Sequence, residues 1–397
     1  MGRTMMDQRG SPTRRESALL DRLAAVLPPG GELVARAPGR ANLIGEHTDY
    51  NDGFVLPVAL EMRTVIGGVR QEHLRLRSLE EPGVVEVDLA DGSGPTTGWG
   101  RYVTAVVRVL QEEGLRLRGL DGVVASDVPV GTGLSSSAAI EVAVALAILE
   151  EPIDAVRLAL LCQRAENVHV GVRSGIMDQL ATAASHGGHA LFIDCRSLEV
   201  QHVPVPPGLR VLLIDSGQRR ELVSGEYNRR REECEEAARL LGIRSLRDLG
   251  DASRLEALPE PMRSRARHVL TENFRTLATV EALRADDRPA LGRLFAASHA
   301  SLASDFAVST PELDALVALA TATDGVVAAR LTGAGFGGCT VNLVDAERAG
   351  GAGAAIGAQY TAGTGRTARW WVSRPAAGAM ELRGPAGGVS PPEQPRR

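Results

Sequence analysis

The 397-residue chain contains no lysine, because all 44 of its basic residues are arginine. This absence excludes every mechanism that depends on a lysine side chain. Among these are a phosphate loop of the G-x-x-x-x-G-K-[ST] type, the strand lysine of protein kinases, a Schiff-base enzyme and a lysine general base. Any phosphate group that binds here must therefore be held by backbone N–H groups, hydroxyl groups, arginine or a metal ion.

Aromatic residues and excess positive charge are also scarce. Phe, Trp and Tyr make up 3 % of the chain, and the formal net charge is −5. Nucleic-acid-binding surfaces need a basic field and stacking side chains. We therefore expect no nucleic-acid partner.

The four cysteines form no C-x-x-C pair, which predicts free thiols in a reducing compartment. The first residues lack the apolar segment of a signal peptide, and the longest apolar run, at 142–149, is too short to span a bilayer. We therefore expect a cytoplasmic protein without a membrane partner. We also expect a monomer.

The densest group of polar residues lies at 39–57, which reads GRANLIGEHTDYNDGFVLP. Its apolar residues keep neither the period of a strand nor that of a helix, so we predict a loop. Glu46, His47 and Asp49 together suit a ligand rich in hydroxyl groups, such as a sugar. A solvated turn and a metal site are open alternatives, because these residue types are also metal ligands.

A second motif, GTGLSSSAA at 131–139, leads into the almost entirely apolar stretch 137–149. We predict a helix there that is buried on all sides. The unpaired N–H groups and positive dipole end of such a helix suit an anion. One serine would suffice to cap the helix, so three serines after two glycines favour a phosphate site.

A third segment, LTGAGFGGC at 331–339, formally satisfies G-x-G-x-x-G. The residues that follow, CTVNLV, predict a strand, whereas a dinucleotide-binding fingerprint requires a helix at that point. The Rossmann interpretation therefore fails, and a glycine-rich hairpin fits the pattern.

The first motif resembles the signature of galactokinases, which belong to the GHMP family of small-molecule kinases. The second and third motifs resemble the phosphate loop and the late glycine-rich segment of that family, and the similarity runs from about residue 33 to 375. The resemblance implies a kinase that uses ATP and Mg²⁺ to phosphorylate the C1 hydroxyl of D-galactose. Its partners would be these small molecules.

The resemblance also implies roles for single residues. Asp178, in GVRSGIMDQL, would accept the proton of the sugar hydroxyl, and Arg40 would orient Asp178 and stabilise developing charge. The implied sugar-binding residues are Arg40, Glu46, His47, Thr48, Asp49, Gly175, Asp178 and Tyr227. The implied nucleotide-binding residues are Gly131, Thr132, Gly133, Leu134, Ser135, Ser136 and Ser137. The implied magnesium ligands are Ser137 and Glu166.

We predict an α+β fold, specifically the two-domain GHMP-kinase fold with mixed sheets and helices and an active site in the cleft between the domains. The predicted segments are a flexible tail at 1–16, a first domain at 17–208 with the sugar motif and phosphate loop, a second domain at 209–378, and a flexible tail at 379–397. Prolines in PVPPG at 204–208 mark the boundary, and Gly, Pro, Arg and Ser mark the tails.

Two other functions stay open at this point. One is another sugar kinase of the same family, acting on N-acetylgalactosamine or arabinose. The other is a non-enzymatic sensor of galactose and ATP. Known sensors of this type resemble galactokinase but lack part of the Ser-Ala stretch, which is complete here at 135–139.

Overall fold

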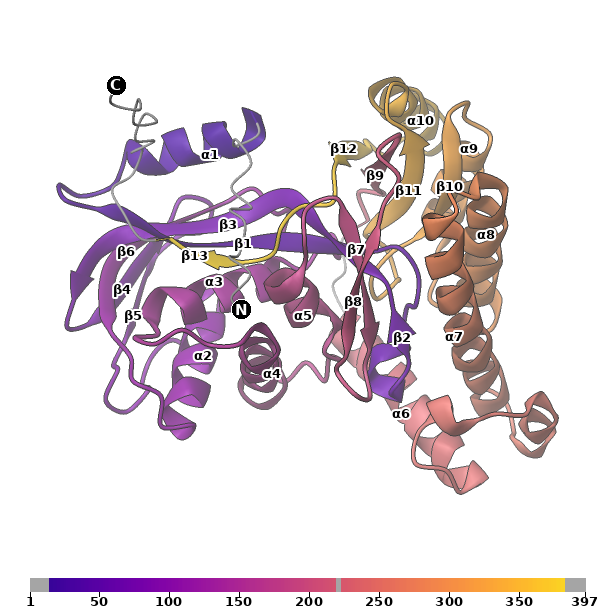
Figure 1. Ribbon diagram of the computed structural model, residues 1–397, viewed down its shortest axis with the longest axis horizontal. Helices are drawn as coiled ribbons and strands as arrows, with labels where there is room; N and C mark the ends of the chain where they lie inside the picture. The colour runs from indigo at the N-terminus through magenta and orange to yellow at the C-terminus, as the bar shows by residue number, and fades with distance from the viewer. Residues whose placement is uncertain (1–13, 219–222, 383–397) are drawn as a thin grey trace, which may run out of the picture.

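The computed structural model of the protein describes residues 14–218 and 223–382, without the side chains of residues 223 and 224. Figure 1 shows an elongated molecule with two parts, which are joined near strands β7 and β8. Both parts combine sheets with helices, so the predicted α+β class is confirmed.

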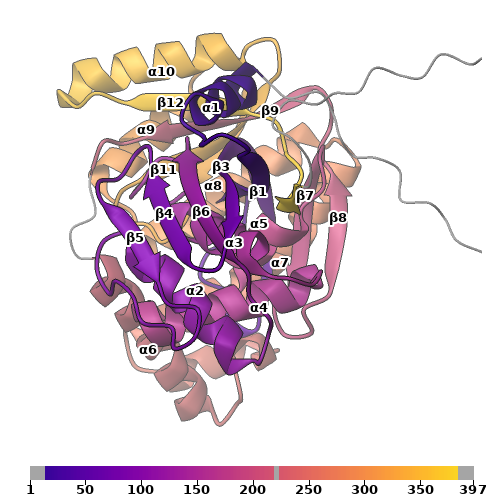
Figure 2. The same ribbon diagram turned by 90° about the vertical axis from the view of Figure 1, so that its left-hand side faces the viewer.

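The first part is built on a six-stranded sheet with the strand order β13-β1-β3-β6-β4-β5. Its pairs are antiparallel except for the parallel pair β4–β6. Helix α1 covers one face, helices α2, α3 and α5 lie against the other, and α4 packs on these three helices (Figures 1 and 2). The bounds are α1 Arg14–Ala24, β1 Glu32–Asn42, β3 Pro57–Gln71, β4 Leu74–Ser78, β5 Val84–Val87, α2 Gly100–Glu112, β6 Gly119–Ser126, α3 Ser136–Ile148, α4 Ala155–Ala165, α5 Met177–Ala184 and β13 Met380–Glu381.

The second part is built on a four-stranded antiparallel sheet with the order β10-β11-β9-β12, and a three-stranded antiparallel sheet, β2-β7-β8, lies between the two parts. Helices α8 and α9 pack on β10, and α10 packs on β12 and β9. The bounds are β2 Phe54–Val55, β7 His189–Asp194, β8 Val200–Pro204, β9 Leu209–Asp215, α6 Val223–Leu241, α7 Met262–Arg284, α8 Arg288–Ser304, α9 Pro311–Thr321, β10 Val326–Leu331, β11 Cys339–Asp345, α10 Ala349–Thr364 and β12 Arg369–Ser373. Short 3₁₀ turns occur at Asp49–Asn51, Leu246–Asp248 and Ala252–Ala257.

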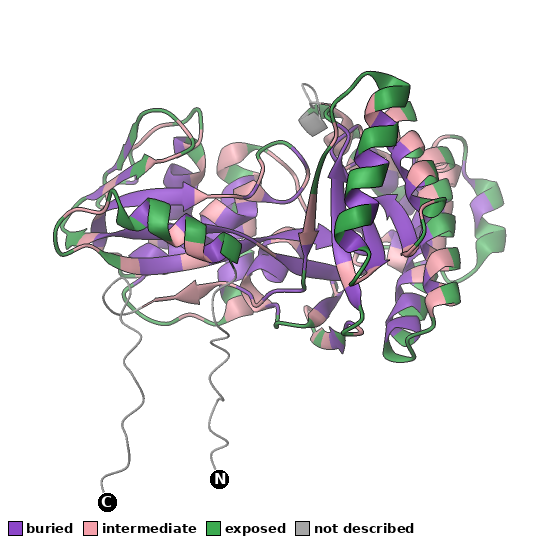
Figure 3. Ribbon diagram, turned by 90° about the horizontal axis from the view of Figure 1, so that it is seen from above, coloured by how far each residue is buried: buried purple, intermediate pink, exposed green. Residues whose placement is uncertain are grey.

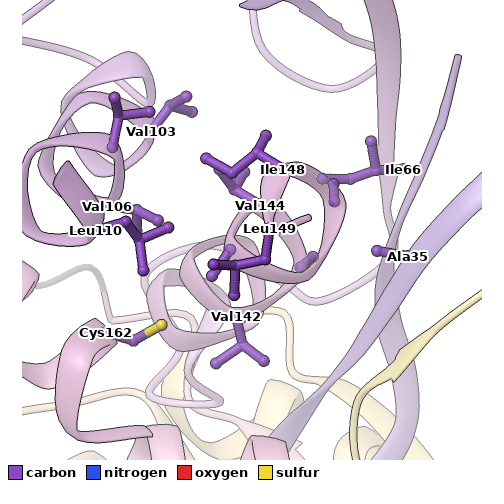
Figure 4. Packing of buried hydrophobic residues seen from close by; sticks show 14 of the residues in the cluster. Ala35, Ile66, Val103, Val106, Leu110, Val142, Val144, Ile148, Leu149 and Cys162 are labelled. Carbon is purple, nitrogen blue, oxygen red and sulfur yellow. The ribbon is translucent and has the colours of Figure 1, made fainter. Parts of the chain in front are cut away.

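Helix α3 is the buried helix that the sequence predicts, displaced by one residue. Its apolar side chains form one cluster with Val103 and Val106 of α2, Cys162 of α4 and Ile66 of the sheet, which lies beside Ile148 (Figure 4). Full burial of one such aliphatic side chain contributes about 1.5–3 kcal/mol. Because α3 is packed on all sides, its N-terminus is held in a fixed position where the second motif ends.

Both predicted tails are shorter than expected. Residues 14–16 belong to α1, and Glu16 is 5 % exposed because it accepts hydrogen bonds from Arg36 and Arg63 at 2.5 and 3.0 Å. At the other end, Met380–Glu381 forms β13 against β1. Local composition cannot indicate such tertiary pairing. The remainder of the predicted tails, 1–13 and 383–397, lies outside the described residues, and the domain boundary after 208 stays a prediction.

The first motif is also less of a loop than predicted. Residues 39–42 complete strand β1, and Phe54–Val55 forms β2, because pairing with β3 and β7 outweighs the irregular apolar pattern.

As predicted, the four cysteines are free, and all four are buried. Among the described helices, none combines the length and apolar character needed to cross a bilayer. Figure 3 shows that burial is concentrated on the central strands of both parts.

Candidate active site

A cavity of about 400 Å³ lies where the two parts of the molecule meet. Most of the predicted site residues line it, namely Arg40, Glu46, His47, Asp49, Gly131, Gly133, Ser135, Ser136, Ser137, Glu166, Asp178 and Tyr227. Gly333 and Ala334 of the third motif line it as well. Three motifs that are far apart in sequence therefore converge on one space.

At the centre of this cavity, Arg40 of β1 holds Asp178 in a bidentate pair. The Arg40 Nε and Nη2 atoms donate to Asp178 Oδ1 and Oδ2 at 2.7 and 2.5 Å. Ser135 Oγ also donates to Oδ2, at 2.5 Å. Asp178 lies in the first turn of α5, so the positive end of that helix adds to the stabilisation of its carboxylate. The geometry fixes the carboxylate in one orientation.

The phosphate loop bends through left-handed backbone conformations at Gly131, Gly133 and Ser135, with φ values of 75°, 82° and 58°. Glycine adopts these angles without steric cost, whereas serine does not. Arg40 Nη1 donates to the carbonyl oxygen of Gly133 at 2.6 Å, so the loop is tied to the Arg40–Asp178 pair. Two predicted loop residues, Thr132 and Leu134, are buried and do not line this cavity.

Glu166 lies where α4 continues into a π-helical turn, Glu166–Val170. Such turns often occur at functional sites. The Glu166 side chain is 6 % exposed, and its Oε2 accepts from Ser174 Oγ at 2.6 Å and from Gln179 Nε2 at 3.1 Å. Burial raises the pKa of Glu166, while hydrogen bonds from Ser174, Gln179 and Ser137 oppose that shift.

Ser137 and Glu166 offer the hydroxyl and carboxylate oxygens that Mg²⁺ prefers, so this donor pair fits the metal. Within 14–218 and 223–382, no group of three or more His, Cys, Asp or Glu side chains is arranged to hold a metal ion. Mg²⁺ ordinarily keeps several water molecules and binds substrate phosphates. A magnesium ion at these two residues would take its other ligands from those sources.

Glu46 joins the first motif to the third. Its Oε2 forms a fully buried ion pair with Arg330 Nη2 at 2.5 Å, and its Oε1 accepts from the Gly333 N–H at 2.7 Å. Asn42 Nδ2 also donates to Oε2, at 2.7 Å. Burial raises the pKa of Glu46, while Arg330 and Gly333 oppose that shift. The carboxylate therefore ties strand β1 to the segment after β10 and presents an edge to the cavity.

His47 has a positive φ of 62°, a strained conformation that non-glycine residues keep mainly where the surroundings enforce it. Its Nε2 faces the carbonyl oxygen of Ala334 at 3.2 Å, so Nε2 donates, and its Nδ1 accepts from the Tyr50 hydroxyl at 2.8 Å. Burial lowers the pKa of His47 well below its usual range, so the ring is neutral at pH 7. Tyr227 stacks obliquely on it at 5.5 Å between ring centroids.

Thr48 does not reach the cavity. Its side chain is fully buried, and its hydroxyl lies 2.9 and 2.7 Å from the carbonyl oxygens of Gly45 and Phe54. The side chain of this predicted sugar-binding residue therefore links the two ends of the loop between Gly45 and Phe54.

Asp49 and Gly175 lie in direct contact across the cavity wall. A Cβ atom at Gly175 would come 2.1 Å from Asp49 Oδ2, so no larger residue fits while Asp49 keeps its position. Burial, together with the nearby charge of Asp178, raises the pKa of Asp49 to about 6. Gly175 thus sets the space that the Asp49 carboxylate occupies.

Replacing Gly175 with alanine should therefore push the Asp49 carboxylate away. We expect kcat/KM for the sugar substrate to fall by roughly 10²-fold, because a displacement of about 1 Å in a site can cost that much. Gly350→Ala is the matched control, because a Cβ there meets nothing within 4 Å. Equal kcat/KM values for Gly175→Ala and Gly350→Ala would show that the contact between Gly175 and Asp49 does not affect catalysis.

Helix α7 supports the sugar motif from behind, and the sequence reasoning missed this role. Glu272 Oε1 accepts from the Gly45 N–H at 3.0 Å, and His268 Nε2 donates to the Glu46 carbonyl oxygen at 3.1 Å. Asn273 Oδ1 accepts from the N–H of Phe54 at 2.9 Å. The only sequence signal is a set of polar residues at i, i+4 and i+5 of a helix, which is equally typical of a solvated face.

A second cavity, of about 330 Å³, adjoins the first and was also missed. Trp99 and Ile140 are among the larger apolar side chains that line it. It shares Arg101, Tyr102, Val130, Ser136 and Ser137 with the first cavity. A ligand could therefore extend from one cavity into the other past the phosphate loop.

Comparison with known families matches three regions of the chain. The galactokinase galactose-binding signature matches residues 28–69. The N-terminal and C-terminal domains of GHMP kinases match residues 101–188 and 279–362. The signature covers the loop that carries Glu46, His47 and Asp49.

Comparison with individual proteins agrees with the family models. The chain is 46 % identical to a galactokinase of Roseiflexus sp. (strain RS-1) over 362 residues, which cover 86 % of this chain and 91 % of that one. It is 47 % identical to a galactokinase of Chloroflexus aggregans over 348 residues, covering 84 % and 89 %.

Among solved structures, Lactococcus lactis galactokinase complexed with galactose aligns with a TM-score of 0.85 and 33 % identity, covering 92 % of this chain and 99 % of that one. A mevalonate kinase aligns with a TM-score of 0.61 at 17 % identity, covering 86 % and 98 %, and so shares the fold. The predicted GHMP-kinase fold is thereby confirmed. On these matches, the chain belongs to the galactokinase family of GHMP kinases.

Proposed function

We propose that this protein transfers the γ-phosphoryl group of ATP to the C1 hydroxyl of D-galactose and releases ADP and galactose 1-phosphate. The supporting observation is the arrangement of one cavity, in which the Arg40–Asp178 pair lies between the sugar motif and the phosphate loop. Family membership supports an ATP-dependent sugar kinase.

Asp178 would act on the sugar hydroxyl. Each carboxylate oxygen can accept two hydrogen bonds. Oδ2 already accepts from Arg40 and Ser135, whereas Oδ1 accepts from Arg40 Nε alone among the described contacts. The remaining acceptor position on Oδ1 would take the C1 hydroxyl and its proton, and Asp178 is exposed enough to reach it, with 24 % of its side chain accessible.

The transfer itself needs positioning and positive potential more than covalent chemistry. The C1 oxygen bonds to the γ-phosphorus as its proton passes to Asp178, and the bond from the γ-phosphorus to the β–γ bridging oxygen breaks, so ADP leaves. The backbone N–H groups around Ser135 and the N-terminus of α3 would stabilise charge on the phosphoryl oxygens. Arg40, which donates to the Gly133 carbonyl oxygen of that loop, would add its positive charge.

Ser137 and Glu166 would hold Mg²⁺, which when bound neutralises phosphate charge. Replacing either residue with alanine should raise the Mg²⁺ concentration needed for half-maximal activity. We expect calorimetry to show weaker binding of MgADP, with binding of metal-free ADP much less affected. Glu113→Ala, at the exposed end of α2, is the control. Magnesium titrations that superimpose on that of the wild type would assign both residues a purely structural role.

The sugar would be held by a largely buried set of donors and acceptors, in which the two rings are uncharged. Burial keeps His47 unprotonated and, by raising the pKa of Tyr227 well above its usual range, keeps that phenol protonated. Glu46 and Asp49 add acceptors. We further propose that the protein works in the cytoplasm, consistent with its free buried thiols, and that it is a monomer.

A coupled assay of ADP release over a panel of sugars tests this proposal. We expect turnover with galactose and far slower turnover with glucose, N-acetylgalactosamine and arabinose. Preferred turnover of N-acetylgalactosamine or arabinose would assign the protein to another sugar specificity. Binding of galactose and ATP without ADP release would instead indicate a sensor.

A further inference from the structure

Arg101 lies where the two cavities adjoin. It is the second residue of α2, and it lines both the 400 Å³ and the 330 Å³ cavities. Among the other residues lining both are Ser136 and Ser137 of the phosphate loop. Arg101 and the phosphate loop therefore border the same two cavities.

Six charged residues line the first cavity, and Arg101 differs from the other arginine among them in having no carboxylate partner in the described part of the chain. The acidic residues are Glu46, Asp49, Glu166 and Asp178, and the arginines are Arg40 and Arg101. Arg40 is engaged by Asp178, and Glu46 is neutralised by Arg330, which does not line the cavity. Among the described residues, no carboxylate forms an ion pair with Arg101.

Tyr102 holds the Arg101 guanidinium in place without neutralising it. Arg101 Nη2 donates to the Tyr102 hydroxyl at 2.9 Å, and the guanidinium carbon lies 4.9 Å from the centre of the ring. A guanidinium has five N–H donors, so most of them stay available to a ligand. An arginine that is oriented by a neutral partner and exposed to the cavity suits an anionic ligand.

Resting on the proposed function, we infer that Arg101 binds a phosphate group of the nucleotide. A polyphosphate that passes between the cavities passes the phosphate loop and Arg101, and arginine matches phosphate oxygens through parallel hydrogen bonds. The chain has no lysine to supply this charge. Arg101 thus provides positive charge from α2, in addition to the backbone N–H groups of the loop.

The test compares Arg101→Ala, Arg101→Gln and Arg101→Lys with the wild type. Loss of one charged hydrogen-bonding partner should raise KM for ATP by roughly 10- to 100-fold and leave KM for galactose within about twofold. Arg101→Gln should resemble the alanine variant, whereas Arg101→Lys should recover part of the loss because it restores charge without the planar fork.

Arg108→Ala is the matched control. Arg108 lies two turns further along α2, donates to the Gly92 carbonyl oxygen at 3.0 Å and lines neither cavity. We expect its KM for ATP to equal that of the wild type. Thermal unfolding of every variant shows whether the fold is kept. If the alanine variant unfolds, the comparison uses Arg101→Gln, whose side chain is closer in length to that of arginine.

Inhibition by ADP and by adenosine separates phosphate binding from contact with the base. A phosphate-binding Arg101 predicts a large increase in the inhibition constant for ADP in Arg101→Ala and little change for adenosine. Equal increases in the inhibition constants of ADP and adenosine would overturn the inference. An unchanged KM for ATP would also overturn it. If the wild type fails to phosphorylate galactose, the proposed function fails, and direct calorimetric binding of ADP to the same variants still decides the role of Arg101.

Discussion

Replacing Asp178 with asparagine is expected to lower kcat by roughly 10²–10⁴-fold in a folded protein. Asparagine keeps the shape of the side chain and can still accept from Arg40, but an amide cannot take up the proton of the sugar hydroxyl. Loss of the charge relieves its repulsion with Asp49 and Glu166, whose pKa values it raises, but leaves the Arg40 guanidinium without its partner carboxylate, so thermal unfolding is measured beside kcat. Steady-state kcat at saturating ATP and galactose is the measurement.

Asp287→Asn is the matched control for this variant. Asp287 caps α8 by accepting from the N–H of Ala290 at 2.9 Å and does not line the cavity. Its kcat should stay close to that of the wild type. A folded Asp178→Asn protein with near wild-type kcat would remove Asp178 from the proton-transfer step.

The ratio of kcat/KM for galactose to kcat/KM for glucose should be at least as large as the expected loss of kcat in Asp178→Asn. The two sugars differ only in the orientation of the C4 hydroxyl, so a site must read that group through hydrogen bonds. From the resemblance, we propose that Asp49 and Tyr227 recognise this hydroxyl. A site with buried polar partners can reject a sugar that leaves them unpaired by about 10⁴–10⁵-fold in kcat/KM. We expect wild-type selectivity of that order and a narrower ratio in Asp49→Ala.

Asp52→Ala provides the comparison within the same loop. Asp52 faces Arg196 at 3.5 Å and does not line the cavity, so its loss should leave the selectivity unchanged. Comparable wild-type kcat/KM values for galactose and glucose would contradict the proposed substrate. An unchanged ratio in Asp49→Ala alone would remove only Asp49 from sugar recognition.

The features predicted well from sequence are those that local chemistry determines. An almost entirely apolar stretch has to be buried on all sides, which predicts α3, and glycines beside serines at its start predict the phosphate loop. The roles of Asp178 and Glu166 came from family resemblance, since a lone carboxylate carries no signal. The structure brings both into the cavity next to that loop.

The features that were missed depend on contacts between distant segments. The contacts of α7 with Gly45, Glu46 and Phe54 join residues more than 200 positions apart, and nothing in the helix pattern indicates them. The resemblance implies a sugar-binding role for Thr48, whereas its side-chain hydroxyl points to the carbonyl oxygens of Gly45 and Phe54. The helical conformation of residues 14–16 was missed because composition does not show that Glu16 contacts two arginines.

The central claim is that the cavity directs the γ-phosphoryl group of ATP to C1 of galactose. Nuclear magnetic resonance of the reaction products, observing ³¹P and the anomeric ¹H of the sugar together, tests it most directly. The account predicts equal amounts of ADP and a single sugar phosphate whose phosphorus couples to the anomeric proton. Phosphate on any other carbon, or ATP consumption without a phosphorylated sugar, would contradict it.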